Sequence, residues 1–521
     1  MSYSRSLRVL IIEDEADVIG AYKTAFELLK TEEGFDLVDP IVAGGVEDAI
    51  AKLSTSSPFH VVILDLKLPE RAGGDAETYA GSGLELVDAI VGRDNYPIPV
   101  LLILTGQPAY IQSFSGLGDR LHRGMYMGFV EQKGLDPRDH FRKALEAAQQ
   151  YVDFGVRIAD VNERPWPPVT TREEDLIRRF GLANSTYAGV DLQWWSAERK
   201  DDGGENPIWS KVLMGHFWLK DHDMETRSYF FKLESREHGE ASFSAVRVLE
   251  GALQHVQVPG QLFSESRSLV VTAQATHSGK PPIALSQFLR RPSGEVGQQL
   301  EGIANDIADQ LEKLGTASDE PKAPHEVVWK YHEVQIERYD ASYLRFQNAD
   351  DFLPSKLLIR LRASSDKPWI KWRSCQHGDL HLGNVSIDVF GGQAHGFLID
   401  AGSMEPGPAA KDLAAFEIAL VLHQTSSTDT VLEAIQGMFG GTDTSGTTSN
   451  DLSVNTLNLL QHVRRRALQA TDEATYRLLL LDQALIQLGS LSYGSFGNKI
   501  ARPTDAVALY RAIAGWYLKG C

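Results

Sequence analysis

The feature that most constrains the fold of this chain is a series of short, continuous apolar segments near its beginning. LRVLIIED, FHVVILDL and IPVLLILTG, with a weaker fourth, MGFVEQ, alternate with stretches that have the apolar period of helices. Strands that are apolar throughout are buried on both faces, and their alternation with helices is typical of a doubly wound parallel sheet. We therefore expect residues 1–152 to form an α/β domain with its functional groups at the carboxyl ends of the strands.

Residues suited to metal binding and phosphate chemistry stand where these segments end. Glu13 and Asp14 follow the first, Asp65 ends the second, Thr105 ends the third and Lys133 follows the fourth. If the strands are parallel neighbours, these side chains converge on one edge of the sheet. Clustered carboxylates there would bind a divalent cation, which lets the Asp65 carboxylate attack a phosphoryl group. The hydroxyl and ammonium groups could then hydrogen-bond the phosphoryl oxygens.

This constellation, in this order, resembles the response-regulator receiver domain over residues 1–152. The resemblance implies a five-stranded parallel sheet of flavodoxin-like topology. It makes Asp65 the phosphoacceptor, with Glu13, Asp14 and Asp65 holding Mg²⁺. It also makes Thr105 the switch hydroxyl and Lys133 the residue that couples phosphorylation to conformation. It further implies a sensor histidine kinase as phosphodonor and leaves open a homodimer formed through the receiver.

Two features depart from the usual receiver pattern. The segment RAGGDAETYAG before Gly83 is longer than receivers usually have, and Gly134 follows Lys133 where they usually have proline. A second interpretation therefore stays open, in which these are solvated strand-end residues of another α/β domain.

Residues 153–205 lose the regular alternation of strands and helices. NERPWPPVTT is a stiff proline-rich piece, and AERKDDGGEN is polar and glycine-bearing, as surface boundaries are. Between them, TREEDLIRRF predicts a short helix, in which Thr171 and Glu174 have the spacing of a capping box. We expect a linker that contains one short helix.

The remainder of the chain changes from strands to helices. SKVLMGHFWLK and RSYFFKLE are strand-like, GEASFSAVRVLEGAL is helical, and after SLVVTAQAT the sequence becomes mostly helical. We expect an α+β bilobal domain, with a small β-rich lobe at 206–275 and a larger helical lobe at 276–521. The segment HGDLHLGN, residues 377–384, falls in the second lobe.

HGDLHLGN contains the residues that phosphoryl transfer to a hydroxyl requires. The chemistry needs a carboxylate near the acceptor hydroxyl and an amide oxygen that holds a metal, and Asp379 and Asn384 supply these groups. His377 is better explained as a buried strut that hydrogen-bonds the loop. Farther on, the apolar strand GFLIDAGS ends in Asp400, which is suitably placed to hold metal. The intervening strand and turn would bring Asn384 and Asp400 together.

Upstream residues predict the nucleotide-facing half of the site. Lys232 lies in the strand SYFFKLE, where a cation can meet the α- and β-phosphates, and Glu240 begins the next helix as its candidate ion-pair partner. The backbone of 272–276 is a candidate hinge for adenine. The nucleotide-covering loop is expected within 210–230, where Gly215 is the one glycine. The alternatives are an ordinary edge-strand lysine and a first-turn acid that the helix dipole favours.

The form of the HGDLHLGN loop resembles the aminoglycoside-phosphotransferase and choline-kinase branch of the kinase-like fold, as do VQVPGQLF and PGPAAKDLAAFE. The resemblance covers residues 205–521. It implies ATP and Mg²⁺ as cofactors, catalytic roles for Asp379, Asn384 and Asp400, and a structural acid at Asp412. The acceptor is then a small-molecule hydroxyl or, because a receiver is attached, a protein serine or threonine. The alternative is a catalytically weak or inactive pseudokinase.

Composition sets outer bounds on these interpretations. A chain of 521 residues exceeds one compact core, so two or three domains are expected. The net charge of −19 argues against nucleic acid as a partner, and two cysteines are too few for a disulfide framework. No apolar run approaches membrane-spanning length, and the N-terminus turns acidic where a signal peptide would stay apolar. We expect a cytoplasmic protein that does not enter membranes.

The two patterns together predict a two-component response regulator. Its output would be an ATP- and Mg²⁺-dependent phosphotransferase gated by phosphorylation of Asp65. The alternative is a binding module that holds nucleotide or a partner protein without turnover, with the receiver setting its affinity. Asp379→Ala separates the two, because it abolishes activity in the first case and spares partner binding in the second.

Overall fold

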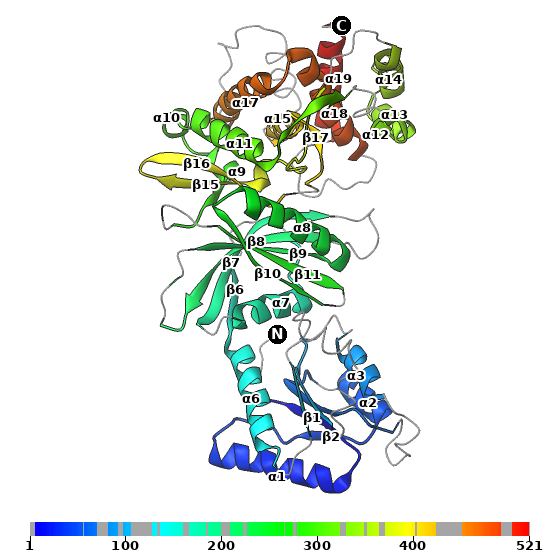
Figure 1. Ribbon diagram of the computed structural model, residues 1–521, viewed down its shortest axis with the longest axis vertical. Helices are drawn as coiled ribbons and strands as arrows, with labels where there is room; N and C mark the ends of the chain where they lie inside the picture. The colour runs from blue at the N-terminus through cyan, green and yellow to red at the C-terminus, as the bar shows by residue number, and fades with distance from the viewer. Residues whose placement is uncertain are drawn as a thin grey trace.

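The computed structural model arranges a parallel α/β domain, a six-stranded sheet and a helical region one after another along its long axis (Figure 1). The α/β domain lies at one end, the sheet in the middle, and α17–α19 at the other end. The residues that the structure describes are 6–55, 57–69, 82–91, 97–105, 128–132, 136–159, 166–183, 186–199, 209–221, 224, 227–264, 266–274, 278, 280–322, 330–347, 352–363, 370–401, 404–423, 451–490 and 503–519.

The N-terminal domain has the doubly wound, five-stranded parallel sheet that was predicted. Its strands follow the order β2-β1-β3-β4-β5, and every neighbouring pair is parallel. They are β1 (Val9–Ile12), β2 (Ile41–Ala43), β3 (Val61–Asp65), β4 (Val100–Thr105) and β5 (Gly128–Gln132). One face packs on α2 (Val46–Thr55) and α3 (Ser82–Val91), and the other on α1 (Ala16–Glu32) and α6 (Arg138–Asp153). Both faces are buried, which explains why the strands are apolar throughout.

The predicted linker at 153–205 is corrected by the structure, because it supplies two strands of the middle sheet and a helix that packs against that sheet. That sheet has the order β10-β11-β9-β8-β7-β6. The segment supplies β6 (Gly155–Ala159), which pairs parallel with β7 (Tyr187–Arg199). The predicted boundary at 205 falls within the connection from β7 to β8 (Trp209–Leu219). Its polar, glycine-bearing sequence therefore marks a connection between strands rather than a boundary between domains.

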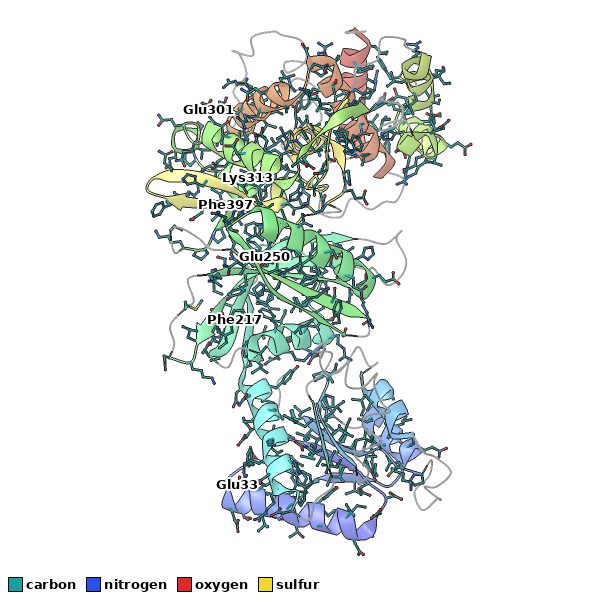
Figure 2. All side chains as sticks on the ribbon, viewed as in Figure 1. Glu33, Phe217, Glu250, Glu301, Lys313 and Phe397 are labelled. Carbon is teal, nitrogen blue, oxygen red and sulfur yellow. The ribbon has the colours of Figure 1, made fainter. Side chains whose placement is uncertain are left out.

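The short helix predicted within that segment is present as α7 (Thr171–Leu182). Its N-cap is Thr170, whose side chain accepts from the N–H of Glu173, while the Glu173 side chain accepts from the N–H of Thr170. The capping box therefore lies one residue earlier than the predicted pair, Thr171 and Glu174. In this register α7 covers one face of the middle sheet, with Phe217 of β8 in the core between them (Figure 2).

The remaining strands of the middle sheet are antiparallel to their neighbours. They are β8, β9 (Ser228–Ser235), β11 (Arg267–Gln274) and β10 (Val256–Phe263). A single long helix, α8 (Arg236–Ala252), follows β9 and packs on β10 and β11. This sheet and its helix form the smaller, β-rich lobe that was predicted.

The larger lobe is mostly helical and has one extensive apolar core. Its helices are α9 (Leu285–Phe288), α10 (Ser293–Val296), α11 (Leu300–Leu314), α12 (Lys330–Glu333), α13 (Ile336–Leu344), α14 (Pro354–Ala363), η3 (Leu382–Asn384), α15 (Lys411–His423), α17 (Asp451–Ala470), α18 (Glu473–Ser490) and α19 (Pro503–Lys519). Its short strands are β12 (Ile283–Ala284), β13 (Ala317–Lys322), β14 (Ile370–Arg373), β15 (Val385–Phe390), β16 (Gln393–Leu398) and β17 (Gly407–Pro408). Within the described ranges, no helix combines the length and apolar character needed to span a membrane.

Candidate functional site

Asp412, near the start of α15, holds the beginning of the HGDLHLGN loop. Its Oδ2 accepts from the N–H of His377 at 2.8 Å, and its Oδ1 from the N–H of Gly378 at 3.0 Å. The fully buried His377 ring has Nε2 3.2 Å from the carbonyl oxygen of Ile399, which can only accept, so Nε2 donates there. Its Nδ1 has no hydrogen-bond partner among the residues that the structure describes. Both side chains therefore act on the loop from inside the protein.

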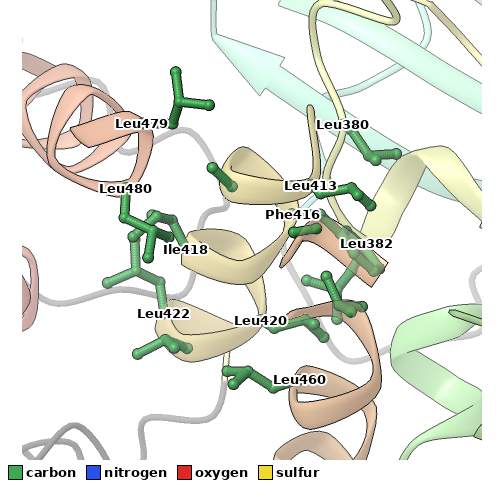
Figure 3. Packing of buried hydrophobic residues seen from close by; sticks show 14 of the residues in the cluster. Leu380, Leu382, Leu413, Phe416, Ile418, Leu420, Leu422, Leu460, Leu479 and Leu480 are labelled. Carbon is green, nitrogen blue, oxygen red and sulfur yellow. The ribbon is translucent and has the colours of Figure 1, made fainter. Parts of the chain in front are cut away.

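Two leucines fix the middle of the loop. Leu380 and Leu382 are buried in the core of the helical lobe, where α15 contributes Phe416 (Figure 3). His381, between the two leucines, and Asp379, just before them, are more accessible, with side chains 25% and 41% exposed. A loop anchored by its leucines thus presents the Asp379 carboxylate at a protein surface.

Asn384 is buried and oriented at the end of the loop. Its Nδ2 donates to the backbone carbonyl of Asp379 at 2.7 Å. With the amide nitrogen engaged, Oδ1 is the atom with which Asn384 can ligate a hard cation. The predicted hairpin that brings Asn384 toward Asp400 is confirmed, because β15 and β16 pair antiparallel and the N–H of Ile399 donates to the carbonyl of Asn384 at 3.0 Å.

Asp400 follows this hairpin and meets a lysine from the other lobe. It has φ +53°, a left-handed conformation that residues with a Cβ adopt at a cost. The Nζ of Lys232, on β9, lies 2.7 Å from its Oδ1, and the two side chains are 15% and 17% exposed. This ion pair joins residues that are 168 positions apart and connects the β-rich lobe to the helical lobe.

The charge of Lys232 is stabilised by carboxylates from both lobes. Burial lowers the pKa of Lys232, but the carboxylates of Asp400 and Glu234, with a smaller effect from Asp379, outweigh burial and raise it above its ordinary value. Glu234 lies two residues along the same strand, with Oε1 3.5 Å from the lysine Nζ. Ser210 donates to this oxygen at 2.9 Å. The lysine is therefore held as a cation by its own strand as well as by Asp400.

The predicted ion pair between Lys232 and Glu240 is corrected by this geometry. Glu240 is exposed on α8, and in the described part of the chain the ion pairs of Lys232 are with Asp400 and Glu234. The N-cap at Ser235 sets the phase of the helix, so that its buried residues are Gly239, Ser242, Ala245, Val246 and Leu249. Ser242 then donates to Glu234 Oε2 at 2.5 Å. Strand alternation was the missed signal, because residues two apart share a face.

Apolar side chains from both lobes pack together beside the ion pair. Val212 and Met214 of β8, Phe230 of β9 and Ile399 of the helical lobe form one buried cluster, against which Trp195 of β7 packs. The Nε1–H of Trp195 donates to the carbonyl of Gly383, in the HGDLHLGN loop, at 2.6 Å. No local feature of the sequence indicates that this tryptophan crosses between the lobes.

The predicted hinge lies at the end of β11. Residues 272–274 belong to this strand, whereas 275 and 276 lie outside the described residues. Gln274 is buried, and its Oε1 accepts from Ser386 at 2.8 Å. Its Nε2 has no hydrogen-bond partner among the residues that the structure covers. A buried donor of this kind suits a ligand with an acceptor atom.

One part of the prediction for the nucleotide-covering loop within 210–230 is corrected, namely the position of its glycine. Gly215 lies inside β8, paired with Leu192 and Tyr229, so it is not in a turn. The segment 210–230 also contains the connection from β8 to β9, residues 220–227, part of which lies outside the described residues.

The acids of the N-terminal domain do converge on one edge of the sheet. Glu13, Asp14 and Asp65 each offer a carboxylate oxygen, and these atoms all lie within 4.8 Å of one another. Glu13 and Asp65 are buried, and the N–H of Lys67 donates to Asp65 Oδ1 at 3.3 Å. Three hard oxygen ligands at this spacing fit Mg²⁺.

The structure describes the other predicted residues of this edge only in part. Thr105 ends β4, the strand next to β3, where its backbone pairs with Gln132, and Lys133 lies outside the described residues. Gly83, the second residue of α3, lies close to the end of β3, because a Cβ there would lie 2.7 Å from the Asp65 carbonyl oxygen. A glycine is thus required at this approach.

The chain was compared with protein-family models, curated proteins and solved structures. No family model and no curated protein matches the chain. Among solved structures, the chain is similar to a glucosamine kinase at 11% identity and a TM-score of 0.36, over 63% of this chain and 95% of that one. It is similar to the ADP-bound aminoglycoside phosphotransferase APH(2'')-Ib at 13% identity and 0.29, over 62% and 94%. It is also similar to an adenylate cyclase from Rhodopirellula baltica at 19% identity and 0.20, over 28% and 90%.

Proposed function

We propose that residues 153–521 form an ATP- and Mg²⁺-dependent phosphotransferase that acts on a hydroxyl, and that the N-terminal domain is a receiver that controls it. The observation that carries the first half is the convergence of Lys232, Asp400 and the HGDLHLGN loop from two lobes. A cation, a metal-binding carboxylate and an accessible carboxylate are the groups that phosphoryl transfer needs in one place.

Each side chain has surroundings that support its role. The Asp379 carboxylate, 41% exposed, would orient an acceptor hydroxyl and take its proton as the oxygen bonds to the γ-phosphorus, while the bond from that phosphorus to the bridging oxygen breaks and ADP leaves. Asn384 Oδ1 and the Asp400 carboxylate would hold Mg²⁺, which neutralises phosphate charge when bound. The Lys232 ammonium, kept charged by Asp400 and Glu234, would meet the α- and β-phosphates.

The receiver half of the proposal rests on the acid cluster. Glu13, Asp14 and Asp65 fit a divalent cation, and the position of Asp65 at the strand end supports a role as nucleophile. In the phosphorylation step, an Asp65 carboxylate oxygen forms the new O–P bond as the N–P bond of a phosphohistidine breaks. A sensor histidine kinase would be the natural donor, and a small acyl phosphate would serve in its place.

The junction between the two parts supports control of one by the other. α6 and β6 are separated by the single residue Phe154, so the receiver's last helix runs directly into the middle sheet. The Tyr151 hydroxyl donates to buried Asp175 of α7 at 2.9 Å. Arg178 of α7 donates from Nη1 to the carbonyl of Tyr151 at 3.2 Å and to that of Phe154. A displacement of α6 would therefore be carried to α7 and β6.

The test is Mg²⁺-dependent ATP turnover by the purified full-length chain, measured as ADP release with water as the acceptor. Asp379→Asn should lower turnover by about 10²–10⁴-fold, the usual contribution of a positioned general base. The dissociation constant for Mg-ATP, measured by calorimetry, should stay unchanged. Turnover by Asp379→Asn at the wild-type rate would contradict the proposal. Nucleotide binding by wild type without turnover would favour the binding module instead.

A further inference from the structure

Trp195 lies where β7 departs from regular pairing with β8. Trp194 pairs with Leu213 and Ser196 pairs with Val212, so Trp195 is the extra residue of a β-bulge. Bulges re-aim side chains and are common beside active sites. The two adjacent tryptophans accordingly have different neighbours: Trp194 stacks on Trp166, with ring centroids 5.2 Å apart, whereas Trp195 contacts the other lobe.

The Trp195 indole is held by contacts of two kinds. Its Nε1–H donates to the Gly383 carbonyl at 2.6 Å, which ties it to the loop that carries Asp379 and Asn384. Its ring meets that of Phe230 edge to face, with centroids 5.0 Å apart and an interplanar angle of 84°. It also covers the cluster that contains Ile399. A hydrogen bond and an aromatic pair of this geometry each stabilise the contact.

The surface under the indole adjoins the residues that would hold phosphates and metal. Phe230 lies two positions before Lys232 on the same face of β9, and Ile399 directly precedes Asp400. A nucleotide whose phosphates reach Lys232 and Asp400 needs an apolar surface next to them for its base and ribose. That surface is the one that Trp195 packs against.

We propose that Trp195 is an inhibitory latch on the interlobe site. Its indole takes the apolar surface that the base of a bound nucleotide requires, and it has to leave the Gly383 carbonyl and Phe230 before the nucleotide binds. This inference rests on the proposed phosphotransferase function and adds the regulation of the same site.

The position of the latch also suits control by the N-terminal domain. β6, which continues directly from the receiver's last helix, pairs with β7 from Gly155↔Gly189 to Ala159↔Gln193. The pairing ends two residues before the bulge at Trp195. A shift of β6 therefore reaches the strand position that sets the orientation of the indole.

The experiment is calorimetric titration of the full-length chain with Mg-ATP. Removing the latch should tighten binding, because the closed form no longer competes with the nucleotide. We expect the dissociation constant to fall about fivefold in Trp195→Phe, which loses the N–H donor, and about thirtyfold in Trp195→Ala, which also loses the aromatic pair. Trp194→Ala is the matched control, one residue away on the same strand, and should leave the dissociation constant unchanged.

The outcomes separate the latch from the function on which it rests. Weaker or equal binding by both Trp195 variants, with wild type binding nucleotide, would overturn the latch and leave the proposed function standing. Weaker binding would identify Trp195 as a stacking platform for the base. Equal tightening in Trp194→Ala would also overturn the latch, because it would report general loosening of β7. Absence of nucleotide binding in wild type and every variant would overturn both proposals.

Discussion

The two candidate sites of this chain are assembled in different ways. In the N-terminal domain, Glu13, Asp14 and Asp65 come from the ends of adjacent parallel strands, so backbone topology brings their oxygens within 4.8 Å. Between the lobes, Lys232 and Asp400 are 168 positions apart and meet because strand β9 of one lobe faces a strand end of the other. The first site gathers like charges, and the second joins opposite charges.

The two kinds of site should respond differently to ligands and to substitution. A cluster of carboxylates gains stability from a bound cation, so its state is set from outside by Mg²⁺ and phosphate. In an ion pair each charge is neutralised by its partner. Loss of one partner therefore leaves the other charge unpaired in a poorly solvated environment. In the function proposed above, the N-terminal site would receive the signal, and the interlobe site would change when its lobes or Trp195 move.

The largest effect on stability is expected at the interlobe ion pair. Lys232→Met should lower the free energy of unfolding by about 3 kcal/mol, because it leaves the Asp400 and Glu234 carboxylates without their cation. Urea unfolding of the full chain measures the change. The control is Lys30→Met, which removes a surface pair with Asp39 at 3.2 Å and should cost at most about 0.5 kcal/mol. Equal losses of stability in the two variants would show that the interlobe ion pair contributes no more than a surface pair.

The N-terminal domain should be the part that responds to acid. Burial, together with the charge of Arg8, lowers the pKa of His60 to about 4, and its Nδ1 accepts from the Arg8 N–H at 2.9 Å. The unfolded chain then binds more protons than the folded one between pH 6.5 and 4. The stabilising contribution of neutral His60 is present above pH 6.5 and is lost as the pH falls toward 4.

This loss should amount to about 2 kcal/mol after allowance for partial exposure of the ring. His60→Asn keeps an acceptor and should flatten the pH dependence of the unfolding midpoint over this range. His238→Asn, at an exposed position of the other domain, is the control. An unchanged slope in His60→Asn would refute the assignment.

Substitutions at Glu234 and Glu240 test which of the two carboxylates stabilises the charge of Lys232. Glu234→Gln should lower kcat/KM for Mg-ATP about tenfold, roughly 1.4 kcal/mol, because it removes a carboxylate 3.5 Å from the lysine while keeping an acceptor for Ser210. Glu240→Gln, on the exposed face of α8, should leave kcat/KM unchanged. The reverse ranking would restore the helix residue as the partner of Lys232.

The smallest effect is expected from Mg²⁺ at the acid cluster. At five times its dissociation constant, Mg²⁺ should stabilise the N-terminal domain by about 1 kcal/mol, seen as a rise in its unfolding midpoint. Asp65→Asn should remove most of this rise, because it takes away one of the clustered ligands. Asp39→Asn, 84% exposed, should not affect it. A rise of equal size in Asp65→Asn would place the metal elsewhere.

The N-terminal sheet and the HGDLHLGN hairpin could be predicted from the sequence because their signals are local. Apolar runs such as VVILD indicate that both faces of β3 are buried. The parallel arrangement of the strands then brings Asp65 to the same edge of the sheet as Glu13. The hairpin of β15 and β16 likewise follows from two short strands around Gly391 and Gly392, both with positive φ. In both regions, the local strand topology brings the residues of the candidate site together.

The predictions failed where the structure depends on the phase of a helix or on strand pairing that the local sequence does not indicate. Glu240 was predicted as an acid at the start of the helix after Lys232, but α8 begins at Arg236, and its N-cap at Ser235 sets which side of the helix is buried. β6 and β7 were missed because a proline-rich stretch and the helix α7 separate these two strands, which pair with each other. Nothing local distinguishes Trp195 from Trp194, since a bulge against β8 determines which of them reaches the other lobe.

The measurement that tests the central claim most directly is ATP turnover before and after treatment with a small acyl-phosphate donor. It would compare wild type with Asp65→Ala in the presence of Mg²⁺. If the acid cluster controls the interlobe site, the donor changes the turnover of wild type severalfold and leaves that of Asp65→Ala unchanged. Equal responses of the two proteins, or no response while acid-labile phosphate accumulates on wild type, would contradict control of the second site by the first.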